Sequence, residues 1–418
     1  MDSYHIKGGN VLRGYIEVSG AKNAALPILA ATVATRGENL LRGCPEISDV
    51  HSMVRILRSL GCTIKWEGEK MSVNTDSMTE CRISDGLMKE MRSSVFLAGA
   101  LLSRCGEAVI SNPGGCNIGK RPIDMHLNGL KQLGVHISHT EDHLLLQGSD
   151  LEGTDITLPY PSVGATENIM LAALSAKGCT RIINSAREPE IVDLQNYINK
   201  CGGKIEGAGT GMIIVEGRRQ LTGCCHKIMP DRIEAGTYLI MALATGGEIL
   251  LKGIDHRLLA PLIDILQKAG YRVETGYGFI YACALGKEKI CCKVDTSPYP
   301  GFPTDLQPQL TALLTVIGEG SAVNENIFEK RLKYGEQLKK MGADIEIYEK
   351  KVIIKNNKIL YGADIVAQDL RGGAALIIAG LAAQGETTVA NAKYIKRGYS
   401  RLTNKITGLG GVITEDGN

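Results

Sequence analysis

The eight residues LRSLGCTI at positions 57–64 place a leucine four positions before Gly61 and an isoleucine three positions after it. This pattern is typical of the last turn of an amphipathic helix, a glycine that ends it, and a strand that follows. The same pattern recurs in LKQLGVHI (130–137), INKCGGKI (198–205), LQKAGYRV (266–273), LKKMGADI (338–345) and ITGLGGVI (406–413). Six copies predict a fold built from six similar units.

The spacing of the copies is nearly constant. Their glycines are Gly61, Gly134, Gly202, Gly270, Gly342 and Gly410, so the intervals are 73, 68, 68, 72 and 68 residues. Upstream of each copy lies an apolar stretch that ends at a glycine turn, such as TYLIMALATGGEILL at 237–251. These stretches have no polar face, so we expect buried helices with the sheets outside them.

The two halves of the chain also match each other. Gly8, Gly14, Gly37 and Gly61 recur at Gly217, Gly223, Gly246 and Gly270, an offset of 209 residues each time and half of the 418-residue length. A chain of this length is too long for one hydrophobic core. We therefore predict two similar domains of three units each.

Composition excludes several classes of function. Lys and Arg number 47 against 45 Asp and Glu, a net charge of +2, which argues against a general nucleic-acid or membrane-binding protein. No apolar run approaches the roughly 20 residues of a membrane span, and the start MDSYHIKGGN predicts no signal peptide. We expect a cytoplasmic protein without a metal site, since no His, Asp or Glu cluster has ligand spacing.

Twelve cysteines occur, but none in a C-x-x-C pair, so we expect reduced thiols instead of disulfides or zinc. Cys62, Cys201 and Cys224 stand beside glycines and are interpreted as packing residues. The exception is NPGGCNIGKRPID at 112–124, where Cys116 lies between glycines and precedes Lys120 and Arg121. This segment is either a surface turn or a mobile loop with a thiol activated by neighbouring cations.

Polar residues gather where each buried helix is expected to start. They include Lys22 and Asn23, Arg92, Ser162 and Gly164, Asp231 with Arg232 and Glu234, Thr304 and Asp305, and Asp369 with Arg371. Helix N-termini favour anions. Capping alone can explain Ser162 and Asp305. A cation at a helix start is unfavourable without an anion, so Lys22, Arg92 and Arg371 point to an anionic ligand.

Five motifs carry a family resemblance: SGAKNAALPI, NPGGCNIGKRPIDMHLNGL, PSVGATENIM, AREPEIVDL and PGFPTDLQPQ. Together they resemble the UDP-N-acetylglucosamine 1-carboxyvinyltransferase family, the enolpyruvyl transferases of peptidoglycan synthesis. The resemblance implies an α/β (α+β) fold of two domains, each with three βαβαββ units, buried helices and outer sheets, an inside-out α/β barrel. It implies boundaries of 1–21 with 230–418 for one domain and 22–229 for the other.

The resemblance also implies roles for individual residues. Lys22 and Asn23 contact phosphoenolpyruvate, and Arg121 and Arg397 bind its charged groups. Asp305 contacts the sugar 3-hydroxyl as the candidate base. Cys116 is the proton donor and the thiol that fosfomycin alkylates. The remaining substrate-binding residues are Arg92, Pro122, Ile123, Asp124, Met125, Ser162, Val163, Gly164, Ile327, Arg331, Asp369 and Arg371.

The implied reaction transfers the enolpyruvyl group of phosphoenolpyruvate to the 3-hydroxyl of UDP-N-acetylglucosamine and releases phosphate, with no cofactor. It is the first committed step of peptidoglycan synthesis. Closure of the two domains would exclude water. The chain departs from the family pattern at Leu332, Tyr394 and Lys396. Two alternatives stay open: the shikimate-pathway relative, which lacks the Pro-Gly-Gly-Cys loop, and a non-catalytic paralogue that senses a nucleotide sugar.

Overall fold

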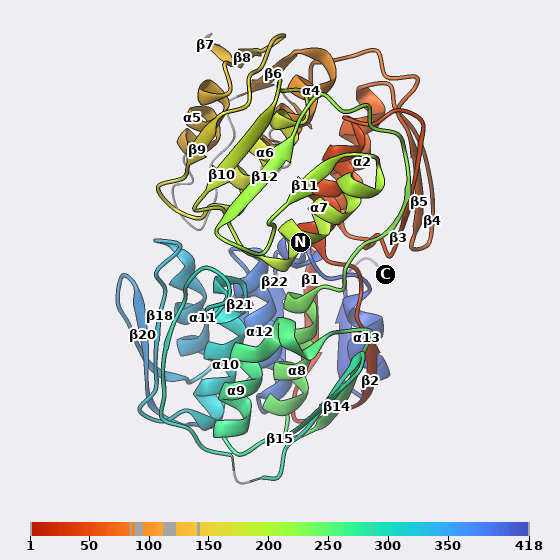
Figure 1. The fold of residues 1–418 in the computed structure, drawn as a ribbon. Coiled ribbons are helices and arrows are strands. Elements are labelled where there is room, and N and C mark those ends of the chain that lie inside the picture. Colours follow the sequence, from red (N-terminus) through yellow and green to blue (C-terminus); the bar gives the residue numbers. More distant parts are fainter. Residues whose placement is uncertain are drawn as a thin grey trace. The chain divides into compact units, whose positions relative to one another are not determined.

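The computed structural model describes residues 2–83, 86–87, 95–111, 123–139, 143–286 and 288–416 (Figure 1). Four of the predicted site residues, Arg92, Cys116, Arg121 and Pro122, lie outside these ranges. The described chain divides into two compact units. Unit 1 comprises residues 2–19 and 230–416, and unit 2 comprises residues 20–111 and 123–229.

Unit 2 holds three repeats. The first contains α1 (Lys22–Thr32), β3 (Glu38–Arg42), α2 (Ser48–Ser59), β4 (Thr63–Glu67) and β5 (Lys70–Asn74), with β13 (Cys225–Lys227) as its edge strand. The second contains α4 (Leu97–Cys105), β6 (Glu107–Ser111), α5 (Asp124–Gln132), β7 (His136–His139) and β8 (His143–Gln147). The third contains β9 (Asp155–Thr157), α6 (Val163–Ala173), β10 (Cys179–Ile183), α7 (Pro189–Lys200), β11 (Lys204–Glu206) and β12 (Met212–Glu216).

Unit 1 repeats the pattern. The fourth repeat contains β2 (Arg13–Glu17), α8 (Arg232–Ala244), β14 (Glu248–Lys252), η2 (His256–Leu259), α9 (Ala260–Lys268), β15 (Arg272–Gly276) and β16 (Phe279–Cys283). The fifth contains β17 (Lys293–Asp295), η3 (Thr304–Leu306), α10 (Gln307–Ile317), β18 (Ala322–Asn324), η4 (Arg331–Lys333), α11 (Tyr334–Lys340), β19 (Asp344–Ile347) and β20 (Lys351–Asn356). The sixth contains β21 (Asp364–Val366), α12 (Leu370–Ala382), β22 (Glu386–Ala390), η5 (Ala392–Arg397), α13 (Leu402–Gly408) and β23 (Val412–Glu415), and β1 (Ser3–Lys7) joins it.

Each repeat contributes one small sheet with one recurring topology. In the third repeat the order is β11-β12-β10-β9, and the fourth, fifth and sixth sheets follow the same order of one parallel and two antiparallel pairs. The edge strand of the first sheet is β13, which comes from the end of unit 2 and pairs with β3 in parallel. The last sheet is completed by β1, which pairs antiparallel with β22 and β23. The repeats are therefore closed by strands distant in sequence.

The central helices are buried, as the sequence predicts. Every residue of α8 is buried, and so are residues 371–381 of α12. In unit 1, α8, α10 and α12 pack against one another (Figure 1). Among the described residues, no helix combines the length and apolarity that crossing a bilayer requires. The mixed α/β fold with buried helices and six small sheets is confirmed.

One expectation about the cysteines is wrong. Cys81 and Cys105 are joined in a disulfide, so not every thiol is reduced. Cys105 is the last residue of α4, and Cys81 precedes Arg82, which forms an isolated bridge with Val109 of β6. This bridge brings the segment before α4 alongside the strand after it, which accounts for the meeting of two cysteines 24 residues apart in sequence. The spacing of cysteines in the sequence carries no sign of this pairing.

Candidate functional site

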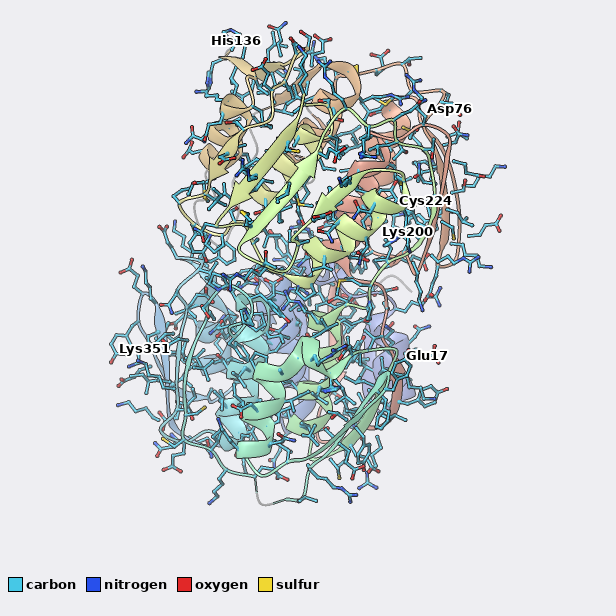
Figure 2. All side chains as sticks on the ribbon, in the orientation of Figure 1. Glu17, Asp76, His136, Lys200, Cys224 and Lys351 are labelled. Atoms are coloured by element: carbon cyan, nitrogen blue, oxygen red, sulfur yellow. A yellow bond between two sulfur atoms is a disulfide. The ribbon has the colours of Figure 1, made fainter. Side chains whose placement is uncertain are left out.

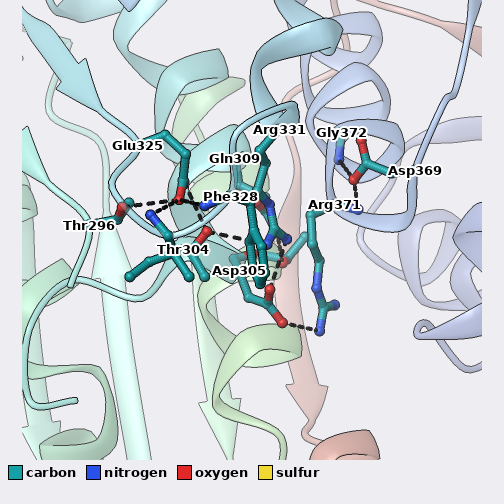
Figure 3. A network of polar contacts seen from close by, with 12 residues as sticks. Thr296, Thr304, Asp305, Gln309, Glu325, Phe328, Arg331, Asp369, Arg371 and Gly372 are labelled. Atoms are coloured by element: carbon teal, nitrogen blue, oxygen red, sulfur yellow. Dashed lines mark hydrogen bonds and ion pairs between the residues drawn. The ribbon is translucent and has the colours of Figure 1, made fainter. Parts of the chain in front are cut away.

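Three segments of unit 1 bring Asp305, Arg331 and Arg371 together (Figure 3). Asp305 belongs to η3, which leads into α10, while Arg331 starts η4 and Arg371 lies in the first turn of α12. Nη2 of Arg331 donates to Oδ1 of Asp305 at 2.8 Å, and Nη2 of Arg371 donates to Oδ2 at 3.1 Å. One guanidinium therefore holds each carboxylate oxygen.

Both arginine side chains of this arrangement are buried, and burial strengthens the interaction between opposite charges. The side chains of Arg331 and Arg371 are 2% and 3% exposed, whereas that of Asp305 is 26% exposed. Burial acts to lower the pKa of Arg371, but Asp305, Tyr399 and Asp231 raise it above its usual value. Opposite charges at this distance favour the ionised carboxylate. Asp305 is thus a partly exposed carboxylate held between two buried guanidiniums.

A second layer of hydrogen bonds holds Arg331 and the loop before it. Nη1 of Arg331 donates to Oγ1 of Thr304 at 3.2 Å, and Thr304 donates to Oε2 of Glu325 at 2.9 Å. Oε1 of the buried Glu325 accepts from the N–H groups of Ile327 and Phe328 at 2.9 and 3.0 Å (Figure 3). The N–H of Ile327 is therefore engaged, so a backbone contact from Ile327 to a ligand would use its carbonyl oxygen.

Tyr399 connects this network to two buried helices. The guanidinium carbon of Arg371 lies 5.6 Å from the centre of the Tyr399 ring. The Tyr399 hydroxyl contacts Oγ1 of Thr237 on α8 at 3.0 Å and accepts from Nε2 of Gln309 on α10 at 3.2 Å. Tyr399 follows η5, whose last residue is the half-buried Arg397. The segment that carries Arg397 is thereby fixed to the same core.

Acidic side chains occupy the helix starts of unit 1. Asp231 caps α8 by accepting from the N–H groups of Ile233 and Glu234 at 2.8 and 2.9 Å. Asp369 caps α12 by accepting from the N–H groups of Arg371 and Gly372 at 3.0 and 2.9 Å. Asp369 is an N-cap, which is a structural role that the sequence did not assign to it. Asp305 lies at the start of the third helix, α10, and its ion pair with Arg371 connects α10 to α12.

In unit 2, Lys22 lies at the start of α1 and forms an ion pair with Asp49 of α2, with Nζ to Oδ2 at 2.6 Å. Both side chains are largely buried, at 11% and 6% exposed. Asn23 follows in the same turn and is half-buried. Asp49 and Asp305 supply carboxylates to Lys22 and Arg371 within the same unit, so the position of these cations at helix starts does not by itself require a ligand.

The starts of α5 and α6 lie against each other. Ser162 caps α6, with its Oγ accepting from the N–H of Ala165 at 3.4 Å. A Cβ on Gly164 would lie 2.9 Å from the Phe96 ring and 3.1 Å from the His126 ring, so only glycine allows this approach. Nδ1 of His126 lies 3.2 Å from Nδ2 of Asn168 on α6. The structure therefore brings the starts of α5 and α6 together, and these starts carry the segments 123–125 and 162–164 that the resemblance assigns to substrate binding.

Sequence reasoning missed three contributors: Glu325, Tyr399 and Asp49. Glu325 stands two residues before Ile327, and Tyr399 stands two residues after Arg397. Proximity to these assigned residues was the only sequence signal for Glu325 and Tyr399. Within the described ranges, no three His, Cys, Asp or Glu side chains are grouped as a metal ion would require. Arg331 and Arg371 are the groups best placed to hold an anionic or hydroxylated ligand beside Asp305.

Comparison with known proteins supports the resemblance. Residues 6–406 match the family of EPSP synthase (3-phosphoshikimate 1-carboxyvinyltransferase). The chain is 46% identical to UDP-N-acetylglucosamine 1-carboxyvinyltransferase 2 of Caldanaerobacter subterraneus subsp. tengcongensis, with 99% of each chain covered. It is 41% identical to the enzyme of the same name from Bacillus subtilis, with 99% and 96% covered.

Solved structures show the same fold. The enolpyruvyl transferase NikO from Streptomyces tendae superimposes with a TM-score of 0.90 at 24% identity, covering 99% of this chain and 98% of that one. The EPSP synthase from Acinetobacter baumannii superimposes with a TM-score of 0.74 at 20% identity, covering 99% and 100%. At these sequence identities, the structural similarity shows only that the fold is shared.

Proposed function

The chain belongs to the family of UDP-N-acetylglucosamine 1-carboxyvinyltransferases, and we propose that it transfers the enolpyruvyl group of phosphoenolpyruvate to the 3-hydroxyl of UDP-N-acetylglucosamine, releasing phosphate. Full-length identities of 41–46% to enzymes of that name support this activity. This reaction opens peptidoglycan synthesis, which places its substrates in the cytoplasm. The observation that carries the proposal is the accessible carboxylate of Asp305 between two buried guanidiniums.

Asp305 is the proposed base. Removing a proton from the sugar hydroxyl requires an ionised carboxylate within hydrogen-bond reach. The guanidiniums of Arg331 and Arg371 fix the orientation of the Asp305 carboxylate, and its side chain is 26% exposed. Proton transfer to Asp305 would convert its carboxylate into a carboxylic acid that the two guanidiniums still hold in place. The aligned ion pairs limit reorganisation during that step.

The residues proposed to bind the nucleotide sugar are those that match the family motifs. In unit 1 we assign Arg331, Asp369, Arg371 and the Ile327 carbonyl to its binding. In unit 2 the segments 123–125 and 162–164 offer two adjacent helix starts, which favour anionic groups such as a diphosphate. Arg92, Arg121 and Pro122 complete the assignment by their match to the family motifs. Asp369 would act indirectly, because its carboxylate already caps α12.

Phosphoenolpyruvate carries a phosphate and a carboxylate, so several cations are required to bind it. We assign Lys22, Asn23, Arg121 and Arg397 to this role. Lys22 is held by Asp49, and such an ion pair keeps the ammonium oriented before the substrate arrives. Substrate anions would add to this contact, since an ammonium can donate three hydrogen bonds.

Cys116 is proposed to donate the proton that C3 of phosphoenolpyruvate gains as the sugar oxygen bonds to C2. The resulting tetrahedral adduct then loses phosphate and a C3 proton, which gives the enolpyruvyl ether. In the sequence, Cys116 precedes Lys120 and Arg121, and a cation near a thiol lowers the pKa of the thiol, which makes it a stronger proton donor. The same property supports alkylation of Cys116 by the epoxide fosfomycin.

The test is phosphate release by the purified protein with phosphoenolpyruvate and either UDP-N-acetylglucosamine or shikimate 3-phosphate as acceptor. We expect release only with the nucleotide sugar, accompanied by enolpyruvyl-UDP-N-acetylglucosamine in the mass spectrum. Release only with shikimate 3-phosphate would favour the relative named by the family match. Binding of the nucleotide sugar without release would favour a sensing paralogue.

A further inference from the structure

Two thiols in unit 2, remote in sequence, lie in direct contact. Sγ of Cys201 and Sγ of Cys224 are 3.3 Å apart, with the Cys201 S–H donating to Cys224. A disulfide needs a separation of about 2.05 Å and a favourable Cβ geometry. The two sulfurs therefore have to approach by little more than 1 Å, which side-chain rotation can provide.

The backbone holds this pair in place. Cys201 is the C-cap of α7, and its N–H donates to the carbonyl of Tyr197 at 3.1 Å. The carbonyl of Cys201 accepts from the N–H of Thr222 at 2.9 Å, and the carbonyl of Cys224 accepts from the N–H of Leu40 at 2.9 Å. The segment that carries Cys224 is thus tied both to the end of α7 and to β3. The contact between the sulfurs is built into the fold.

The two thiols differ in their environments. Cys201 is 1% exposed and belongs to the core, while Cys224 is half-buried. The hydrogen bond from Cys201 lowers the pKa of Cys224 against the opposing effect of burial, and Lys200 lowers it further. The hydrogen bond to Cys224 and burial raise the pKa of Cys201. Cys224 is therefore the nucleophile of the pair and Cys201 its protonated partner.

Of the two thiols, only Cys224 is partly exposed to solvent. Lys200 and Cys224 are labelled in Figure 2, on the segments that end α7 and precede β13. Because Cys224 is half-buried, a small uncharged oxidant can reach its sulfur, whereas Cys201 is shielded by the core.

We propose that Cys201 and Cys224 are a redox-active pair that a hydroperoxide converts into an intramolecular disulfide. The Cys224 thiolate attacks the terminal peroxide oxygen, the O–O bond breaks, and hydroxide or alkoxide leaves, so that Cys224 becomes a sulfenic acid. Cys201 then attacks the Cys224 sulfur, and water leaves with the proton of Cys201. Two thiols are oxidised by two electrons and one peroxide is reduced. This replaces the interpretation of both cysteines as packing residues and does not depend on the proposed enzymatic activity.

The experiment treats the full-length protein with hydrogen peroxide, blocks remaining thiols with N-ethylmaleimide, digests with trypsin without reduction, and identifies linked peptides by mass spectrometry. The expected product joins residues 201–204 to residues 220–227. The second peptide also contains the exposed Cys225, which supplies a matched control. C225S should keep the linked pair, and C224S should lose it. In the wild-type product, fragment ions from cleavage of the bond between residues 224 and 225 show which of the two cysteines carries the disulfide, so this assignment needs no variant.

A second variant tests the order of the steps. In C201S, the Cys224 sulfenic acid has no partner and should accumulate, so dimedone should label residue 224 several-fold more than in the wild type. The proposal is overturned if C224S still forms the link. It is also overturned if wild-type Cys224 is oxidised to sulfinic acid while Cys201 is alkylated, or if peroxide modifies Cys225 and leaves both Cys201 and Cys224 free.

Discussion

Glu167 lies within α6 and is 1% exposed, with its Oε1 accepting no hydrogen bond from any described residue. Burial raises the pKa of Glu167 well above its usual value, and the charges of Glu190 and Glu188 raise it further. A carboxyl whose pKa is raised on folding stabilises the protein fully below its unfolded pKa of about 4.3. That contribution is lost as the pH rises through the folded value.

Replacing Glu167 with glutamine should therefore stabilise the protein at high pH. E167Q resembles the protonated acid and does not titrate, so its midpoint of thermal unfolding should exceed that of the wild type at pH 8. The difference should shrink as the pH falls towards 4.5. The exposed Glu206, replaced as E206Q, is the control and should show no such trend. A difference for E167Q that is constant across this range contradicts the raised pKa.

The proposed role of Cys116 has its own test. C116S should abolish single-site labelling by fosfomycin, because an alcohol is a far weaker nucleophile than a thiolate. C116D should keep turnover and resist the drug, because a carboxylic acid can still donate a proton. Intact-mass spectrometry measures the labelling and phosphate release measures the turnover. Persistent labelling of C116S at one site would refute the assignment.

Single residues were only partly predictable from the sequence. The residue types at the expected helix starts identified Lys22, Asp305 and Arg371. The partners of Asp305 are 26 and 66 residues away along the chain, so nothing local indicates that two guanidiniums meet it. Glu325 acts through its carboxylate on a loop that precedes η4, and a lone glutamate in a sequence gives no sign of such a role.

At the scale of the element, the first turn of α12 contains Gly372 and Gly373. The structure explains the second glycine. A Cβ on Gly373 would lie 2.6 and 3.0 Å from the buried side chain of Ile395, which belongs to η5. The same segment ends at Arg397. Gly373 therefore allows η5 to pack closely on the start of α12.

G373A should destabilise the protein although alanine favours helices by about 1 kcal/mol. Forcing a methyl group into a packed core costs about 1–3 kcal/mol, so the clash should outweigh the gain. G408A is the matched control, because a Cβ on Gly408 in α13 meets no atom within 4 Å. Urea unfolding should show a gain for G408A and a loss for G373A. A gain for both would mean that the contact with Ile395 relaxes freely.

Buried helices were the elements that the sequence predicted best, since α8 is buried over its whole length and α12 from residue 371 to 381. The edge strands could not be predicted in the same way. β9, β13, β17 and β21 are three residues long each, too short for an alternating pattern to stand out. Their positions follow from the repeat, because each occupies the same place in its sheet.

At the scale of the whole molecule, the constant offset of 209 residues predicted two similar halves. It did not show which strands cross between sequence-distant repeats. β13 closes the first sheet from the far end of unit 2, and β1 and β2 pair with strands of the C-terminal half. In these pairings the sheet keeps its usual strand pattern, but one strand comes from a distant part of the chain. The spacing of repeats along the sequence cannot show such an exchange.

The predicted domain boundaries can be tested as folding units. A fragment of residues 20–229 keeps all three sheets of unit 2 and should unfold cooperatively by itself. A fragment of residues 20–222 lacks β13, exposes the edge of β3, and should unfold at a lower urea concentration or aggregate. Circular dichroism during urea titration measures both. Failure of the longer fragment to unfold cooperatively would contradict the proposed domain of residues 22–229.

The account as a whole depends on Asp305 being the reactive carboxylate that Arg331 and Arg371 hold in place. The most direct measurement is steady-state phosphate release from phosphoenolpyruvate and UDP-N-acetylglucosamine by D305N. The control is D264N, which changes an exposed aspartate of unit 1. We predict that kcat of D305N falls about 10²- to 10⁴-fold, while D264N keeps wild-type kcat and both variants keep their circular dichroism spectra. A folded D305N with kcat within about twofold of the wild type would contradict the account.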